Sequence, residues 1–349
     1  MATKKEEKQF EKERKAAIKA RHKKMKEEGI ENYLTPDQIK YNRRKAAIGV
    51  VWPIFRFLIL FGLCFIILYP LIFMLSTAFR PNEQMNDPSV VWLPKSFTMQ
   101  NIKDVWGVMK FGDTAINTVI LNLIASVLQV VTCSITGYGF ARFKFKGKSF
   151  LFAIVILMII VPPQITTIPL YMQYAYFDLF GIIPLFNGGN SISLINSPLT
   201  MYLPALFANG IRAGLFIFIF RQFFRGLPKE LEDAAYLDGC SPLYTYVKIM
   251  IPNAKQSFLT VFLFSIVWYW NDYYVSSSFF TRNDTVALML KNLNTNLTQQ
   301  LFDGQSVSVR QIIVWLEAGC LLSITPILIM YIFLQRYFIE GIERSGLAN

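Results

Sequence analysis

Six long apolar stretches constrain the fold of this 349-residue chain more than any other feature. A transmembrane helix needs about 20 predominantly apolar residues, and each stretch reaches that length. Charged residues make up only 17% of the chain, against about 25% in soluble domains. The sequence therefore predicts an all-α integral membrane protein with six transmembrane helices. The stretches run from about Arg56 to Phe79, Thr114 to Ala141, Phe150 to Tyr174, Met201 to Phe220, Phe258 to Phe280 and Ile312 to Phe338.

Basic residues between the stretches predict the orientation, because cytoplasmic loops of membrane proteins are enriched in Lys and Arg. Residues 142–148, after the second stretch, carry four basic residues. Residues 221–255, after the fourth stretch, carry five, whereas residues 175–200 carry none. This alternation predicts a multi-pass protein with both termini in the cytoplasm.

The first 45 residues are a charge-dense head, with 15 Lys or Arg and 8 Asp or Glu in a chain of net charge +12. The first apolar stretch begins too late for a cleaved signal peptide, so we expect it to remain as an anchor. A basic head beside a membrane is typical of contact with anionic lipid, which we favour over nucleic-acid binding. We divide the chain into this cytoplasmic extension (1–49), a first helix and outer loop (50–113), a transmembrane core (114–338) and a cytoplasmic tail (339–349).

Catalytic and metal-binding chemistry find little support in the sequence. His22 is the only histidine, and the four cysteines lack the spacing of metal ligands or a redox pair. Gly147-Lys148-Ser149 looks like the end of a phosphate-binding loop, but Arg142 stands where that motif requires glycine. We therefore expect no catalytic residue, no metal site and no cofactor bound by this chain.

The longest cytoplasmic segment between two stretches, residues 226–253, has signals for two short helices. Pro228 suits a first helical position, and Gly239 suits a left-handed helix end. Ser241 can cap a second helix that has Pro242 at its first position. Two such helices are too short to span a membrane and predict a rigid cytoplasmic knob.

An apolar stripe on the first of these helices needs a partner. Leu231, Ala234 and Ala235 stand at i, i+3 and i+4, which places them on one helical face. A solvated loop does not require such a stripe. We interpret it as a docking surface.

The same segment closely resembles the EAA motif of ATP-binding-cassette (ABC) importer permeases. The resemblance lies in Asp233-Ala234-Ala235, then Asp238-Gly239, and finally Ile249-Met-Ile251-Pro252. Asp233 replaces the usual glutamate and Cys240 the usual alanine. The resemblance implies that Asp233, Ala234, Ala235, Asp238, Gly239, Ile249 and Pro252 couple this chain to an ATPase subunit. We call residues 226–253 the coupling segment.

Further segments are similar to maltose-type, MalG-like sugar permeases, and the similarity covers roughly residues 50–345. They are Tyr69-Pro70 to Arg80, Tyr138 to Gly147, Trp270-Asn271-Asp272 and Leu334 to Gly341. The resemblance implies a type I importer fold in a bacterial plasma membrane, which moves a sugar or oligosaccharide by alternating access. It also implies a second, MalF-like permease, an extracytoplasmic sugar-binding protein and two ATPase subunits that hold ATP and Mg.

Ionisable residues inside membrane spans are functional candidates by default. Arg212 lies near the middle of the fourth stretch, Asp272 in the outer half of the fifth and Glu317 near the outer end of the sixth. Trp268, Trp270 and Asn271 flank Asp272, and aromatic faces with polar neighbours suit sugar rings. These six residues are the candidate substrate path. The alternatives are buried ion pairs that fix helix packing, and aromatic residues at the membrane interface.

The third stretch contains Pro162-Pro163, and proline bends a helix by removing a backbone donor. In lipid the freed carbonyls need partners, so we expect this helix to face the bundle interior or a cavity. A simple packing kink is the alternative.

Other functions remain open at this point. An ABC permease could carry glycerol phosphate, a polyamine or a peptide. An ion-coupled secondary transporter could use Asp272 and Glu317 but would not need a docking knob. A membrane scaffold could recruit a partner through its basic head.

Overall fold

The computed structural model describes residues 12–13, 16, 20, 36–81, 83–84, 87, 90, 92–179, 181–282, 285–302 and 307–346. The chain divides into two compact units, Met1–Pro70 and Leu71–Asn349. Most of the charged extension predicted for residues 1–49 lies outside the described residues.

The first unit contains most of helix α2, which spans Pro36–Ala78. Its 28-residue portion Val51–Ala78 is long and apolar enough to cross a membrane, as predicted. The helix runs continuously across residue 50, although Pro53 and Pro70 lie inside it.

In the second unit, two long helices correspond to the second and sixth apolar stretches. Helix α4 (Phe111–Arg142) is a continuous 32-residue helix, and α17 (Val309–Gly346) contains a 27-residue portion of sufficient length and hydropathy. The third stretch is broken, because α5 (Lys148–Ile160) and α6 (Pro163–Ala175) meet at an angle of 101°. The Pro162-Pro163 pair thus produces a much sharper bend than a packing kink.

The fourth stretch is not the continuous helix that its hydropathy predicts. Helix α8 (Leu199–Leu206) and helix α9 (Ala213–Gly226) are separated by residues 207–212, so that prediction is wrong. Within the break, Ala208 and Arg212 have positive φ values of 54° and 61°. Such angles are rare outside glycine and persist only where the surroundings hold them.

The fifth stretch also ends early. Helix α13 (Lys255–Trp270) stops ten residues before Phe280, and a separate helix, α14 (Tyr274–Phe279), follows it. Counting each bent pair as one span, up to five segments of the described residues are long and apolar enough to cross a membrane, so the sixth span remains a prediction.

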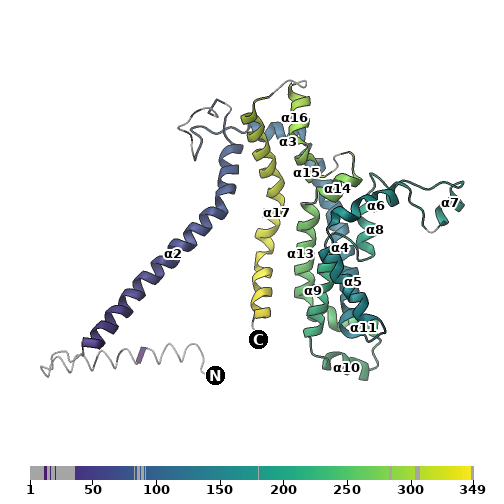
Figure 1. The fold of residues 1–349 in the computed structure, drawn as a ribbon, viewed down its shortest axis with the longest axis horizontal. Helices are drawn as coiled ribbons and strands as arrows, with labels where there is room; N and C mark the ends of the chain where they lie inside the picture. Colours follow the sequence, from purple (N-terminus) through teal and green to yellow (C-terminus); the bar gives the residue numbers. More distant parts are fainter. Residues whose placement is uncertain are drawn as a thin grey trace. The chain divides into compact units, whose positions relative to one another are not determined.

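Figure 1 shows how the second unit places its functional parts. Helix α4 packs against α8, α9 and α13, while α13 also packs against α17. The coupling segment lies at one end of these helices, and α14 lies near the other. Outside the coupling segment, the other helices that the structure describes are α3 (Gln100–Val108), α7 (Ile182–Phe186), α15 (Val286–Lys291) and α16 (Leu293–Phe302).

Glycine permits the close contact between α4 and α9. A Cβ atom at Gly137 would lie 2.6 Å from Phe220 Cβ, whereas one at Gly139 meets nothing within 4 Å. We expect Gly137→Ala to destabilise this contact by about 1–3 kcal/mol through overpacking. Gly139→Ala is the matched control, expected to stabilise the helix by about 0.5–1 kcal/mol. Thermal unfolding of the detergent-purified protein measures both, and equal melting temperatures would contradict the proposed packing.

Candidate functional site

The coupling segment folds as two helical parts separated by a tight turn. Helix α10 (Glu230–Leu237) is followed by a turn at Gly239, whose φ of 77° is the left-handed conformation predicted from the sequence. The Ser241 side chain then accepts a hydrogen bond from the Tyr244 amide at 3.3 Å and begins α11 (Pro242–Thr245). A π-helical turn, η2 (Tyr246–Met250), and α12 (Ile251–Asn253) complete the segment.

One local prediction is wrong. Pro228 precedes α10 instead of occupying its first position, because the helix begins two residues later.

A buried ion pair attaches the coupling segment to the end of α4. Arg142 Nε lies 3.1 Å from Glu232 Oε2, and the two side chains are only 11% and 6% exposed. Tyr138 donates a hydrogen bond from its hydroxyl to Glu232 Oε1 at 2.6 Å. Arg142 also donates from Nη2 to the carbonyl of Leu227 at 2.8 Å. We call Tyr138, Arg142 and Glu232 the latch.

Aromatic packing surrounds the latch. The Tyr138 ring lies 4.9 Å from that of Tyr246 and 5.4 Å from that of Phe224, measured between centroids. The Tyr246 hydroxyl also shares a 2.7 Å hydrogen bond with Ser134 on α4. Both helical parts of the coupling segment are therefore joined to α4 by side chains.

Glu232 was not among the predicted coupling residues, whereas its neighbour Asp233 was. Asp233 is exposed and pairs with Lys229 one turn away, at 3.7 Å, which is a weak surface interaction. The sequence signal for this pair was the presence of Glu232 beside Asp233 together with Arg142 at the end of an apolar stretch. Arg142 was interpreted only as a marker of membrane topology.

The exposed apolar surface of the coupling segment differs from the predicted stripe. Ala235 is buried against the chain itself, whereas Ala234 is exposed and Leu231 half-buried. The most exposed large apolar side chains are instead those of Leu237 (89%) and Leu243 (71%). Of the other predicted coupling residues, Asp238, Gly239 and Pro252 are exposed and Ile249 is half-buried.

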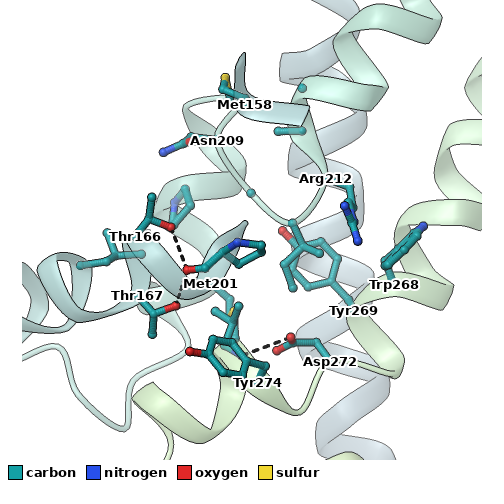
Figure 2. Close-up of a pocket in the computed structure, with 18 of the residues that line it drawn as sticks. Met158, Thr166, Thr167, Met201, Asn209, Arg212, Trp268, Tyr269, Asp272 and Tyr274 are labelled. Carbon is teal, nitrogen blue, oxygen red and sulfur yellow. Dashed lines mark hydrogen bonds between the residues drawn. The ribbon is translucent and has the colours of Figure 1, made fainter. Parts of the chain in front are cut away.

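A cavity of about 600 Å³ lies where the two broken helices meet α13. Its wall includes residues on both sides of the α5–α6 bend, the α8–α9 break and the end of α13. Figure 2 shows Arg212 and Trp268 on one side of the view, with Thr166 and Thr167 on the other. The expectation that the proline-bent helix faces a cavity is confirmed.

Polar side chains of α4 and α13 hold the α8–α9 break in place. Gln129 donates to the carbonyl of Ile211 at 2.6 Å and accepts from the Tyr269 hydroxyl at 2.6 Å. Thr132 donates to the carbonyl of Ala205 at 2.7 Å. Carbonyls freed by a helix break need partners inside a membrane. Gln129 supplies one for Ile211, and Thr132 adds a second donor to the Ala205 carbonyl, which also accepts from the Ala208 amide at 3.3 Å.

Four of the six candidate substrate-path residues line this cavity: Arg212, Trp268, Asn271 and Asp272. The guanidinium carbon of Arg212 lies 4.3 Å from the centre of the Trp268 ring, a cation–π distance. Because Arg212 lies in the break and not inside a helix, its side chain reaches the cavity from the N-terminal end of α9.

Asp272 lines the cavity and also supports the local backbone. Its carboxylate accepts hydrogen bonds from the amides of Val275 (3.2 Å) and Ser276 (2.8 Å) and from the Ser276 hydroxyl (2.8 Å). These bonds satisfy free amides at the start of α14. Within the described residues Asp272 forms no ion pair, so the buried ion pair considered as an alternative is not seen here, and the acid instead holds the start of α14 through these three donors.

The other two candidates lie outside this cavity. Trp270 is buried and donates from its indole nitrogen to the carbonyl of Ser323 at 3.0 Å, beside a second cavity of about 320 Å³. Glu317 is half-buried on α17 and lines neither cavity. The sequence placed all six residues on one path because it could not show which helical faces turn inward.

The sequence is similar to known membrane transport proteins. The family model for the binding-protein-dependent transport system inner membrane component matches residues 133–344. The arabinooligosaccharides transport system permease protein AraQ of Halalkalibacterium halodurans is 29% identical over 303 residues, covering 85% of this chain and 98% of its own length. The melibiose/raffinose/stachyose import permease protein MelC of Bacillus subtilis is 25% identical over 283 residues, covering 80% and 91%.

A solved structure also shares the fold. It is that of a bacterial ABC transporter involved in the import of the acidic polysaccharide alginate, and it matches with a TM-score of 0.62. The match covers 82% of this chain and 96% of the other, at 20% sequence identity.

Proposed function

Because this chain belongs to the family of binding-protein-dependent transport system inner membrane components, we propose that it is the permease subunit of an ABC importer that moves a sugar or oligosaccharide inward by alternating access. The similarity to AraQ and MelC supports this class of solute. The observation that carries the proposal is the family match over residues 133–344, which includes the coupling segment and the α8–α9 break.

Members of such importers work with a second permease, an ATPase and a binding protein. We propose a MalF-like partner permease, two ATPase subunits that bind ATP and Mg, and an extracytoplasmic sugar-binding protein. ATP hydrolysis is then the work of the partner, and this chain supplies the path and the docking surface. The basic loops support a cytoplasmic position for both termini, with the coupling segment on the same side.

We propose that the cavity is part of the solute path. Arg212 supplies hydrogen-bond donors, Asp272 retains acceptor capacity, and the Trp268 face offers an apolar platform for a sugar ring. This combination of an aromatic surface with a few placed polar groups is typical of small-molecule sites.

Trp268→Ala is expected to lower the maximal rate of uptake about tenfold, the effect of losing about 1.4 kcal/mol of interaction. Trp268→Phe keeps an aromatic face and is expected to retain most of the rate. Uptake of labelled oligosaccharides by proteoliposomes that contain the complete importer measures both variants. Affinity of the isolated binding protein serves as an internal control, and a normal rate for Trp268→Ala would remove this residue from the path.

An ion-coupled secondary transporter finds less support. Its candidate coupling acids are Asp272, which caps α14, and Glu317, which lies outside both cavities. Uptake that persists without the ATPase and collapses with the ion gradient would favour that mechanism over ours.

A further inference from the structure

Helix α4 makes side-chain contacts with two functional regions that lie far apart. Near its C-terminal end it holds the coupling segment through the latch. Toward its middle it holds the cavity wall through Gln129 and Thr132. Thirteen residues separate Gln129 from Arg142, which corresponds to about 20 Å along a continuous helix.

The latch contacts disfavour separation of α10 from the C-terminal end of α4. The Glu232 carboxylate receives both a cation and a hydroxyl donor, and it is nearly excluded from solvent. A buried charge that loses its partner is strongly disfavoured, so separating α10 from α4 would leave two uncompensated ions. Motion of the coupling segment should therefore carry this end of α4 with it.

The middle of α4 also contacts the cavity wall directly, through Gln129. Gln129 is fully buried and uses both ends of its amide, one on the Ile211 carbonyl and the other on the Tyr269 hydroxyl. Ile211 immediately precedes Arg212, whose side chain lines the cavity. A displacement of α4 therefore acts on the α8–α9 break and on α13 together.

We propose that the coupling segment and α4 move as one rigid body, and that Tyr138, Arg142 and Glu232 are positioning residues that transmit this motion to the cavity wall. The inference rests on the proposed docking role of the coupling segment. It differs from that role because the latch side chains pack within this chain and present little surface to an ATPase.

The test measures solute transported per ATP hydrolysed by the complete importer in proteoliposomes, with its binding protein present. Glu232→Gln removes the charge at nearly constant volume, and Tyr138→Phe removes one hydrogen bond while its ring contacts remain. For both variants we expect normal ATPase co-purification and ATP hydrolysis near the wild-type rate. Transport per ATP is expected to fall about fivefold or more, because about fivefold is the smallest effect typical of energetic coupling between two sites.

Glu83→Gln is the matched control, because it makes the same chemical change at an exposed position outside the coupling segment and both cavities. It is expected to keep wild-type transport per ATP. If Glu232→Gln does not assemble, Tyr138→Phe decides the question. A wild-type ratio in Tyr138→Phe would overturn the proposal, and so would loss of the ATPase from an otherwise folded Glu232→Gln complex, since that would make Glu232 a docking residue.

A second pair of variants tests continuity along α4. Gln129→Leu breaks the cavity end, and we expect it to lower transport per ATP in the same way. If one rigid element carries the motion, the double variant Gln129→Leu/Tyr138→Phe transports as much solute per ATP as the poorer of the two single variants. If the two sites act independently, the fold-reductions in transport per ATP multiply. Multiplying effects would overturn the rigid-body proposal. Failure of the docking role is recognised separately, by normal ATPase retention and transport in Leu237→Asp.

Discussion

Leu237→Asp is expected to release the ATPase from the importer and to reduce uptake about 30-fold or more. This side chain is 89% exposed and stands at the end of α10, beside the left-handed turn at Gly239. Losing an apolar anchor at an interface weakens binding by about 2 kcal/mol or more, and a buried aspartate adds a desolvation penalty. Co-purification of the ATPase with tagged permease measures the loss directly.

Leu185→Asp provides the comparison for this experiment. Leu185 is 80% exposed, also on a short helix, but α7 does not belong to the coupling segment. We expect this variant to retain the ATPase at the wild-type ratio. Equal retention in both variants would show that the apolar surface around Leu237 is not the docking site.

The second large effect is expected at Gly210, in the break that shapes the cavity. A Cβ atom here would approach Gln129 Oε1 and the Tyr269 hydroxyl to less than 3.0 Å. Gly210→Ala must therefore displace the hydrogen-bonded Gln129–Tyr269 pair. Leaving a buried polar group unsatisfied costs about 1–3 kcal/mol of folding free energy, and overpacking adds strain to that cost. We expect a marked fall in melting temperature and nearly complete loss of uptake.

Gly226→Ala is the corresponding control. Gly226 is the last residue of α9, and a Cβ atom added there meets nothing within 4 Å. This variant is expected to melt and transport like the wild type. If Gly210→Ala behaved like Gly226→Ala, the contact between the break and the Gln129–Tyr269 pair would not be needed for function.

Local sequence signals predicted the coupling segment well. The turn at Gly239 and the cap at Ser241 follow from backbone preferences of single residues, which act over a few positions. Hydropathy likewise located α4 and the apolar part of α17, because length and composition are sufficient for an uninterrupted span.

The broken helices show where hydropathy stops being informative. It averages over about 20 residues and cannot detect the six-residue break at 207–212, which depends on Gln129 and Thr132 from another helix. The latch was missed for the same reason, since Arg142 and Glu232 meet only after folding. Pro204 and Gly210 were available signals for a break, because both weaken a helix.

The latch also has a consequence for how the protein is made. Arg142 leaves the ribosome 90 residues before Glu232, so at about 5–20 residues per second it waits roughly 5 to 20 seconds for its counter-ion. During that interval the end of α4 carries an uncompensated charge and gains its buried position only when α10 emerges. Synthesis of the coupling segment therefore completes the buried ion pair at the end of a helix that was made much earlier.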